Sequence, residues 1–248
     1  MMKQRTVQII MRWPAFYRVI RKIYWTLQLQ HLTELLIGTK AGERRWATRS
    51  IAKSYWDNRD HRNTHFLCER IATFSPAHSI FEVGCASGPN LYLLAKRFPQ
   101  AQITGVDINQ AAIEYGNVQF AHEGISNVKL LVRKADELGE FQDRAFDITF
   151  TSALLIYIGP DRIKEVIKGM IRITQQALVL MELHRFEPNA KDAFGLGIYW
   201  YGNWLRDYVA LLKQFVPEEQ IRVTKIPEDV WPGEPWKELG AVIEVDMR

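Results

Sequence analysis

Hydrophobic and polar positions along this chain change their spacing in a regular order, which predicts strands and helices in alternation. Apolar runs of about four to eight residues between Gly, Pro or Asp are typical of buried strands, and apolar residues three and four apart are typical of helices. Strands are expected over residues 79–83, 102–106, 128–132, 146–150, 177–183, 221–226 and 241–245. Helices are expected over residues 61–74, 89–98, 109–123, 161–173 and 201–215.

This alternation indicates an α/β fold, with a doubly wound, mostly parallel sheet covered by helices on both faces. The segment between the last two strands contains Pro227, Pro232, Gly233 and Pro235, which do not suit a crossover helix. These two strands are therefore expected to pair as a C-terminal antiparallel hairpin. The prediction is a sheet of seven strands in one domain over residues 51–248.

Residues 1–50 have a different pattern and are predicted to be an N-terminal helical arm. Phe16, Ile20, Ile23 and Leu27 recur at helical spacing, and a second helical run over residues 32–37 ends at Gly38. Residues 39–60 are polar and are interpreted as a connection with a short helix. The arm carries ten Lys or Arg against two Glu, a balance of +8, whereas the remaining residues balance to −4.

Two interpretations of this basic amphipathic arm remain open. Its apolar face can lie on a membrane surface, with Lys and Arg toward anionic headgroups. Alternatively, that face packs on the body of the protein or on a second copy of the chain. Peripheral membrane contact through residues 1–38 is therefore one expectation for the arm, and the oligomeric state is left open.

Composition limits the class of protein. With 47% hydrophobic and 24% charged residues among 248, the chain is typical of a globular protein, which excludes disorder and fibres. No apolar run reaches the about 18 residues of a membrane-spanning helix, and the N-terminus lacks the pattern of a signal peptide. Cys68 and Cys85 are too few for a disulfide framework or a four-ligand zinc site. The expected compartment is the cytoplasm.

The most informative segment is the turn after the first expected strand. Glu82 lies near the end of that strand, Gly84 and Gly88 follow, and a helix begins at Pro89. Glycine allows a positive φ and a close approach of ligand to backbone, and a helix N-terminus offers free N–H groups. Ligands of doubly wound sheets bind at the carboxyl ends of the strands, so this turn predicts a ligand site.

The spacing of this turn disfavours a dinucleotide. The fingerprint G-x-G-x-x-G, started at Gly84, requires glycine at position 86 and Gly or Ala at position 89, where the chain has Ala86 and Pro89. The carboxylate of Glu82 would also repel a pyrophosphate, whereas it suits a cationic ligand. Asp107 closes the second strand, where an acid can accept both hydroxyls of a ribose.

Glu82, Gly84 and Gly88 resemble motif I, E-x-G-x-x-x-G, of the class I S-adenosylmethionine-dependent methyltransferases. The resemblance extends over about residues 50–248 and implies a Rossmann-like seven-stranded fold, S-adenosyl-L-methionine as cofactor, and methyl transfer. The chain departs from many members at Cys85-Ala86-Ser87, where Gly-x-Gly is common, but the residues remain small.

The resemblance also assigns residues to parts of the cofactor site. Asp107 matches the ribose-binding acid, Asp136 matches the acid that meets the adenine amino group, and Ser152 follows the strand beside the methionine part. The stretch 54–57 is similar to the segment that folds over the cofactor, and contributes Tyr55. The implied cofactor-binding residues are Glu82, Gly84, Cys85, Ala86, Gly88, Asp107, Ile108, Asp136, Ser152 and Tyr55.

His184, which follows the fifth expected strand, is the candidate general base, because an imidazole exchanges protons near neutral pH. Glu182 is the alternative acid of that turn. Tyr157, after the fourth strand, is expected either to line the acceptor pocket or to pack beneath the next helix. A metal site is not expected, because the catechol-type magnesium site needs carboxylates where the chain has Ser152 and His184.

Several functions remain open after these assignments. The leading one is methyl transfer to a small-molecule, sugar or glycan, or lipid-linked acceptor at oxygen. Residues 151–154 do not match the [ND]-P-P-[YF] signature of enzymes that methylate amines of bases and glutamine. The alternatives are a membrane-associated binding or scaffold protein that keeps the cofactor fold, an RNA methyltransferase, and an aminopropyl transferase. Nucleic acid is disfavoured as a partner because the body is acidic.

Overall fold

The computed structural model of the chain describes residues 30–187, 192, 194–200 and 202–248. The chain divides into two compact units, Met1–Gly38 and Thr39–Arg248. The helix expected over residues 16–27 lies outside the described residues. In the first unit, residues from Gln30 onward belong to α3 (Gln30–Ala47), which is interrupted at Gly38, where φ is 34°. The second unit begins at Thr39, within the segment that the sequence assigns to the arm.

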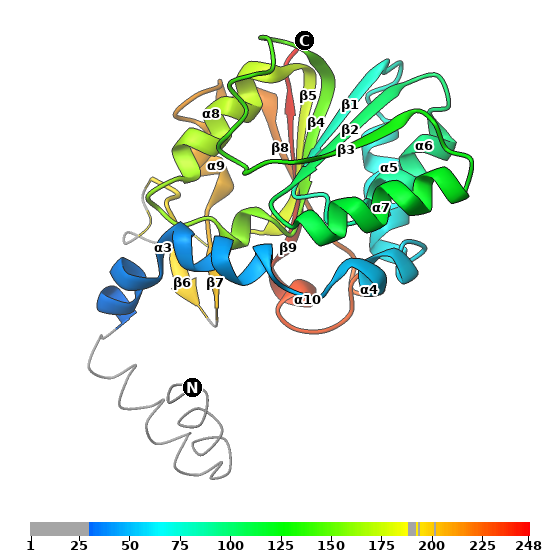
Figure 1. Ribbon diagram of the computed structural model, residues 1–248. Coiled ribbons are helices and arrows are strands. Elements are labelled where there is room, and N and C mark those ends of the chain that lie inside the picture. The colour runs from blue at the N-terminus through cyan, green and yellow to red at the C-terminus, as the bar shows by residue number, and fades with distance from the viewer. Residues whose placement is uncertain (1–29, 188–191, 193, 201) are drawn as a thin grey trace, which may run out of the picture. The chain divides into compact units, whose positions relative to one another are not determined.

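The second unit is built on a seven-stranded sheet, which lies at the centre of Figure 1. Its strands are β1 (Ser79–Val83), β2 (Gln102–Asp107), β3 (Val128–Val132), β4 (Phe146–Ser152), β5 (Thr174–Leu183), β8 (Ile221–Lys225) and β9 (Gly240–Asp246). They follow the order β3-β2-β1-β4-β5-β9-β8, in which the first five are parallel and β9 is antiparallel to both its neighbours. The expected doubly wound sheet with its C-terminal hairpin is confirmed.

Helices cover both faces of this sheet (Figure 1). One face carries α5 (Arg62–Ala72), α6 (Pro89–Arg97) and α7 (Gln110–His122), and the other carries α8 (Ile163–Ile173) and α9 (Tyr208–Leu212). Adjacent residues of β1 pack on opposite faces: Ile80 belongs to the cluster with Leu67 of α5, and Phe81 belongs to the cluster with Met170 of α8. Burial on both faces is the reason that neighbouring residues of β1, Ile80 and Phe81, are both apolar.

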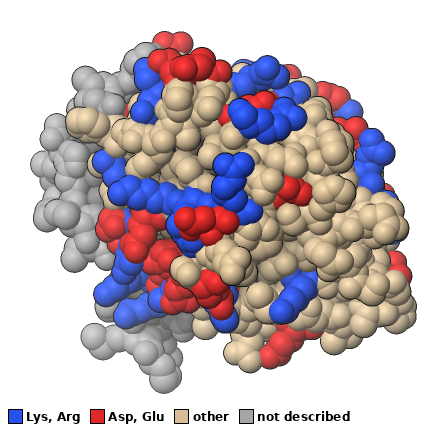
Figure 2. Space-filling model, turned by 90° about the horizontal axis from the view of Figure 1, so that it is seen from above, with Lys and Arg blue, Asp and Glu red and all other residues tan. Residues whose placement is uncertain are grey.

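The amino ends of the parallel strands β1–β5 lie at one end of the sheet, and this end of the molecule carries charges of both signs. The C-terminus lies at this end because β9 is antiparallel to β5. Figure 2 looks onto this end and shows Lys and Arg interspersed with Asp and Glu. Such an alternation creates no extended field of one sign. Among the described helices, none combines the length and apolar character needed to cross a membrane.

The helix expected over residues 201–215 is wrong in its first part. The chain there forms a hairpin of β6 (Ile198–Trp200) and β7 (Asn203–Leu205), and only α9 is helical. Tyr199 packs across the hairpin on Trp204, with ring centroids 5.2 Å apart. Asp207 then caps α9 by accepting a 3.0 Å hydrogen bond from the backbone N–H of Ala210. Aromatic residues favour paired strands, and this contact outweighs the helical spacing of the same residues.

Short elements complete the second unit. Residues 39–60 contain two helical segments, the end of α3 and α4 (Ala52–Asp57), where a single short helix is expected. The remaining elements are η1 (Leu155–Tyr157), η3 (Glu218–Gln220) and α10 (Trp236–Leu239). Asp147, at the start of β4, accepts hydrogen bonds from the backbone N–H groups of His78 and Ser79 at 2.6 and 3.1 Å. It therefore ties β4 to the start of β1.

Candidate functional site

A cavity of about 490 Å³ lies at the carboxyl ends of β1, β2 and β4. The strand order reverses direction between β1 and β4, and this is where doubly wound sheets bind their ligands. The sequence-identified residues that line the cavity are Tyr55, Glu82, Gly84, Cys85, Ala86, Asp107, Ile108, Asp136, Ser152 and Tyr157. The fold thus brings residues from Tyr55 to Tyr157 together at one cavity.

The loop from Gly84 to Gly88 has three residues with positive φ: 80° at Gly84, 48° at Ala86 and 83° at Gly88. A Cβ added at Gly84 would lie 2.7 Å from a methyl group of Leu154, and one at Gly88 would lie 2.7 Å from the ring of Phe120. Both positions therefore require glycine for conformation and for space. Gly84 lines the cavity, whereas Gly88 shapes the loop and precedes α6.

Glu82 is a buried carboxylate with one oxygen left for a ligand. Its side chain is 1% exposed, and Oε1 accepts a 2.6 Å hydrogen bond from the amide of Asn90. Oε2 is buried and has no hydrogen-bond partner among the described residues. Burial raises the pKa of Glu82 to about 8, against the opposing effect of the Asn90 hydrogen bond. A cationic group in the cavity would satisfy this oxygen and favour the charged form.

Asp107 is held in a fixed position at the end of β2. Its Oδ2 accepts a hydrogen bond from the backbone N–H of Ala86, and its Oδ1 accepts one from Asn109, both at 2.8 Å. Burial raises the pKa of Asp107, and these backbone hydrogen bonds oppose the rise. Asp107 therefore links the glycine loop after β1 to the start of α7, and Ile108 lines the cavity beside it.

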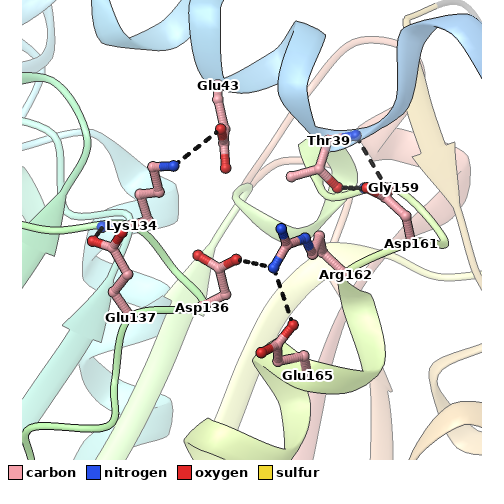
Figure 3. A network of polar contacts seen from close by, with 9 residues as sticks. All are labelled: Thr39, Glu43, Lys134, Asp136, Glu137, Gly159, Asp161, Arg162 and Glu165. Carbon is pink, nitrogen blue, oxygen red and sulfur yellow. Dashed lines mark hydrogen bonds and ion pairs between the residues drawn. The ribbon is translucent and has the colours of Figure 1, made fainter.

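Asp136 lies in a network of ion pairs at another side of the cavity (Figure 3). The guanidinium of Arg162 lies 2.9 Å from Asp136 and 3.2 Å from Glu165. Asp136 keeps only 13% of its side chain exposed. A ligand that hydrogen-bonds to Asp136 would share the carboxylate with Arg162, because a carboxylate has two oxygens and several lone pairs.

The second part of α3 forms a wall of the cavity that the sequence pattern does not mark. Thr39 Oγ1 donates to Asp161 at 2.8 Å and accepts from the backbone N–H of Gly159 at 2.9 Å. Glu43 forms an ion pair with Lys134 at 3.5 Å, as Figure 3 shows. These contacts fix α3 against the loops after β3 and β4, and Thr39, Gly42, Glu43 and Trp46 line the cavity.

Aromatic side chains form part of the same wall. The rings of Trp46 and Tyr157 lie 4.7 Å apart, and Tyr55, which is 39% exposed, lines the cavity as well. Burial is the largest cause that raises the pKa of Tyr157, to about 12. At neutral pH its phenol is therefore protonated and can donate a hydrogen bond, but it is poorly suited to take a proton.

His184 does not line the cavity. It is 4% exposed, its Nδ1 accepts a 3.3 Å hydrogen bond from the backbone N–H of Tyr208, and its ring packs on Phe186. Burial lowers the pKa of His184. The geometry gives no support to its role as general base and makes it a buried contact between β5 and α9.

Cys85 is buried, with 1% of the residue exposed. Burial raises the pKa of its thiol, and the acids Asp107 and Glu82 raise it further. A Cβ added at Gly105 would lie 2.7 Å from Sγ, so the thiol occupies a tightly packed position beside β2. Cys85 is therefore a small loop residue, in agreement with its interpretation from the sequence.

Comparisons of sequence identify the central part of the chain. Residues 80–177 match a family model described as a methyltransferase domain. Malonyl-[acyl-carrier protein] O-methyltransferase of Priestia megaterium is 27% identical over 144 residues, which cover 53% of this chain and 50% of that protein. The protein of the same name from Anoxybacillus flavithermus is 30% identical over 83 residues, 34% of this chain and 31% of that protein. The matched segment thus spans half or less of these relatives.

Solved structures share the fold. A geranyl diphosphate methyltransferase in complex with GPP and sinefungin superposes with a TM-score of 0.64 at 13% identity, covering 85% of this chain and 99% of that chain. The [4+2]-cyclase SpnF superposes with a TM-score of 0.51 at 18% identity, covering 64% and 57%. Because these two proteins are named for different reactions, the shared fold alone does not decide which reaction this chain performs.

Proposed function

We propose that this protein, whose residues 80–177 match a methyltransferase domain model, transfers a methyl group from S-adenosyl-L-methionine to an oxygen of a small-molecule acceptor. The observation that carries the proposal is the convergence of three strand-end carboxylates, Glu82, Asp107 and Asp136, on one cavity. Sugars, glycans and lipid-linked molecules belong to the acceptor classes that we propose.

The three carboxylates suit three parts of that cofactor. The unpartnered Oε2 of Glu82 suits the ammonium group of the methionine part. Asp107 suits the ribose hydroxyls, since its position is fixed by two backbone N–H groups. Asp136 suits the amino group of the adenine. The glycine loop supports the same fit, because a Cβ at Gly84 would overlap Leu154 and narrow this part of the cavity.

When bound, S-adenosyl-L-methionine supplies a methyl group that is already activated by the positive charge on its sulfur. The protein therefore has to align donor and acceptor and exclude water. The carboxylates orient the cofactor, and the wall of Trp46, Tyr55 and Tyr157 is positioned to cover the cavity. The phenol of Tyr157 is a candidate donor to the acceptor, because its proton is retained at neutral pH.

Calorimetry with S-adenosylhomocysteine tests the cofactor half of this proposal. Asp107→Ala should weaken binding by about 1–3 kcal/mol, which corresponds to about fivefold to 150-fold in affinity. Asp143→Ala is the matched control, because this exposed carboxylate pairs with Arg172 and does not line the cavity. Equal affinity in the Asp107→Ala variant and the wild type would remove Asp107 from the cofactor site.

Labelled methyl groups test the reaction itself. The full chain is incubated with a cell extract and S-adenosyl-L-methionine that carries an isotopically labelled methyl group, and products are found by mass spectrometry. A labelled methyl ether or ester supports O-methyl transfer. Binding of S-adenosylhomocysteine without any labelled product favours the alternative, a binding or scaffold protein that keeps the cofactor fold. A labelled RNA fraction favours the RNA methyltransferase.

We also propose peripheral membrane contact through residues 1–38, on the basis of their basic and amphipathic sequence. Flotation with liposomes tests this proposal. The full chain should float with anionic liposomes at low salt, less so at high salt, and not with neutral liposomes, because each basic residue near an anionic surface contributes about 1 kcal/mol. A chain that stays at the bottom with anionic liposomes at low salt has an arm that packs on protein.

A further inference from the structure

The turn over residues 153–158, which follows β4, forms one wall of the cavity. Ala153, Leu154, Tyr157 and Ile158 all line it. Ala153 has a φ of 54°, in the left-handed region that non-glycine residues rarely adopt. A backbone in this region persists only where its surroundings hold it, so the contacts of this turn decide where its wall lies.

A buried carboxylate holds the N–H groups of this turn. Oε1 of Glu182, at the end of β5, accepts hydrogen bonds from the backbone N–H groups of Leu154 at 3.1 Å and Leu155 at 3.0 Å. The same oxygen accepts a 2.8 Å hydrogen bond from the hydroxyl of Thr151. Glu182 is fully buried, and its Oε2 has no hydrogen-bond partner among the described residues.

A buried guanidinium holds the carbonyl groups of the same turn. Arg206, which follows β7, is fully buried and donates from Nη1 to the carbonyl oxygen of Leu155 at 2.6 Å and from Nη2 to that of Ile158. Its Nε donates to the carbonyl oxygen of Leu196 at 3.1 Å, at the start of the β6–β7 hairpin. A Cβ at Gly197 would lie 3.0 Å from Cγ of Arg206, so the hairpin closes directly over this side chain.

From these contacts we propose that Glu182 and Arg206 are a positioning pair for the methyl transfer. Opposite charges from β5 and from the β6–β7 hairpin hold the two sides of the turn over residues 153–158, and so set the acceptor-side wall that carries Tyr157. This inference rests on the proposed function. Neither side chain lines the cavity, so both act through the turn.

The burial of both charges supports a specific role for the pair. Burying a charge is unfavourable unless it is hydrogen-bonded, and the turn meets this need for both side chains, with N–H groups on Glu182 and carbonyl groups on Arg206. Burial raises the pKa of Glu182 to about 7, although the turn's N–H groups oppose the rise. The other ionisable groups that face the pair are Tyr208 and Asp192 beside Arg206, and Tyr157 and Tyr208 beside Glu182. The turn also packs Leu154 on Gly84, which links it to the cofactor loop.

Glu182→Gln separates the charge from the shape, because glutamine keeps an accepting oxygen. In the full chain we expect its affinity for S-adenosylhomocysteine to stay within about twofold, whereas labelled methyl transfer to a cell extract falls by about tenfold or more. The wild-type rate should change with pH near the pKa of Glu182, about 7, and the variant should lose this inflection. Glu182→Ala should raise the hydrogen-exchange rates of the Leu154 and Leu155 amides by about tenfold or more.

Glu244→Gln is the matched control, since Glu244 is a buried carboxylate on β9 that pairs with Arg70 and does not line the cavity. This variant should leave the pH profile and the exchange of the Leu154 and Leu155 amides unchanged. A wild-type rate and pH profile in Glu182→Gln, or unchanged exchange of both amides in Glu182→Ala, would overturn the positioning role. If the wild type transfers no methyl group, the proposed function fails. The hydrogen-exchange experiment then still tests whether Glu182 holds the turn over residues 153–158.

Discussion

Two regions of the molecule form the cavity, and they are built in different ways. The first runs from Glu82 to Asp107 and consists of two strand ends joined by a glycine loop. The second joins the end of α3 to the turn over residues 153–158, and the β6–β7 hairpin supports this turn without lining the cavity. The first region is rigid because parallel strands fix its geometry, whereas the second depends on a few buried polar contacts. We therefore expect substitutions in the first region to change cofactor affinity, and substitutions in the second region to change mainly the position of the acceptor.

The largest effect is expected at Glu82, in the first region. Burial raises the pKa of Glu82 in the folded protein to about 8, above the ordinary value of 4.5, so its contribution to stability is fully present below about pH 4.5 and is lost as pH rises through about 8. The difference corresponds to about 4–5 kcal/mol. Glu82→Gln should therefore flatten the fall in melting temperature between about pH 5 and pH 9. Exposed Glu219→Gln is the control, and equal slopes in all three proteins would contradict the burial of this charge.

Gly84→Ala should disturb the contact between the two regions, because Gly84 of the glycine loop lies against Leu154 of the turn over residues 153–158. A φ of 80° costs an alanine about 1–3 kcal/mol, and its Cβ would overlap Leu154 at 2.7 Å. The expected result is a loss of S-adenosylhomocysteine affinity of about tenfold to one hundredfold, measured by calorimetry. Gly139→Ala is the control, because nothing lies within 4 Å of its added Cβ. Unchanged S-adenosylhomocysteine affinity in Gly84→Ala would contradict the prediction, because it would mean that the loop from Gly84 to Gly88 accommodates the added methyl group.

His184→Ala tests a residue that the sequence assigns to catalysis and the structure places outside the cavity. Its loss leaves the buried N–H of Tyr208 without its acceptor, which should cost about 1–3 kcal/mol of unfolding free energy. Methyl transfer should fall by less than tenfold, whereas loss of a general base lowers rates by about 10²–10⁴. Chemical denaturation measures the loss of unfolding free energy, and labelled methyl transfer measures the loss of rate. A rate loss of about 10²–10⁴ would support His184 as the general base.

Thr39→Val should have the smallest effect, in the second region. The variant loses the side-chain hydrogen bonds to Asp161 and Gly159, each worth about 1 kcal/mol, while its shape is retained. We expect a slightly lower melting temperature and faster release of S-adenosylhomocysteine, measured by stopped flow. Thr48→Val is the control, because Thr48 is exposed, follows the end of α3, and its hydroxyl donates to the carbonyl oxygen of Arg44. Equal release rates in Thr39→Val and Thr48→Val would mean that the contacts of Thr39 do not affect cofactor release.

The same division explains how far the sequence could predict the site. The apolar run of β1, the two glycines and the acid at the end of β2 follow one another within a short stretch, so spacing alone indicates the cofactor loop. Trp46 gave no such signal, since it lies in a polar segment whose contact with Tyr157 arises only on folding. The sequence pattern likewise does not mark Arg206, although its side chain carries the contacts between the hairpin and the turn.

Periodicity by itself predicted the strands of the sheet. Strands that are buried on both faces are rich in apolar residues, and this enrichment can be recognised in the sequence before the neighbouring strands are known. Periodicity failed in the first part of residues 201–215, where Trp204 pairs with Tyr199 across β6 and β7 and the helix begins only at Tyr208. Only the tertiary structure decided that His184 does not line the cavity and that Glu182 and Arg206 hold one of the cavity's walls. The physical reason is that burial and hydrogen bonding of a charge depend on neighbours from distant segments, whose positions no local pattern encodes.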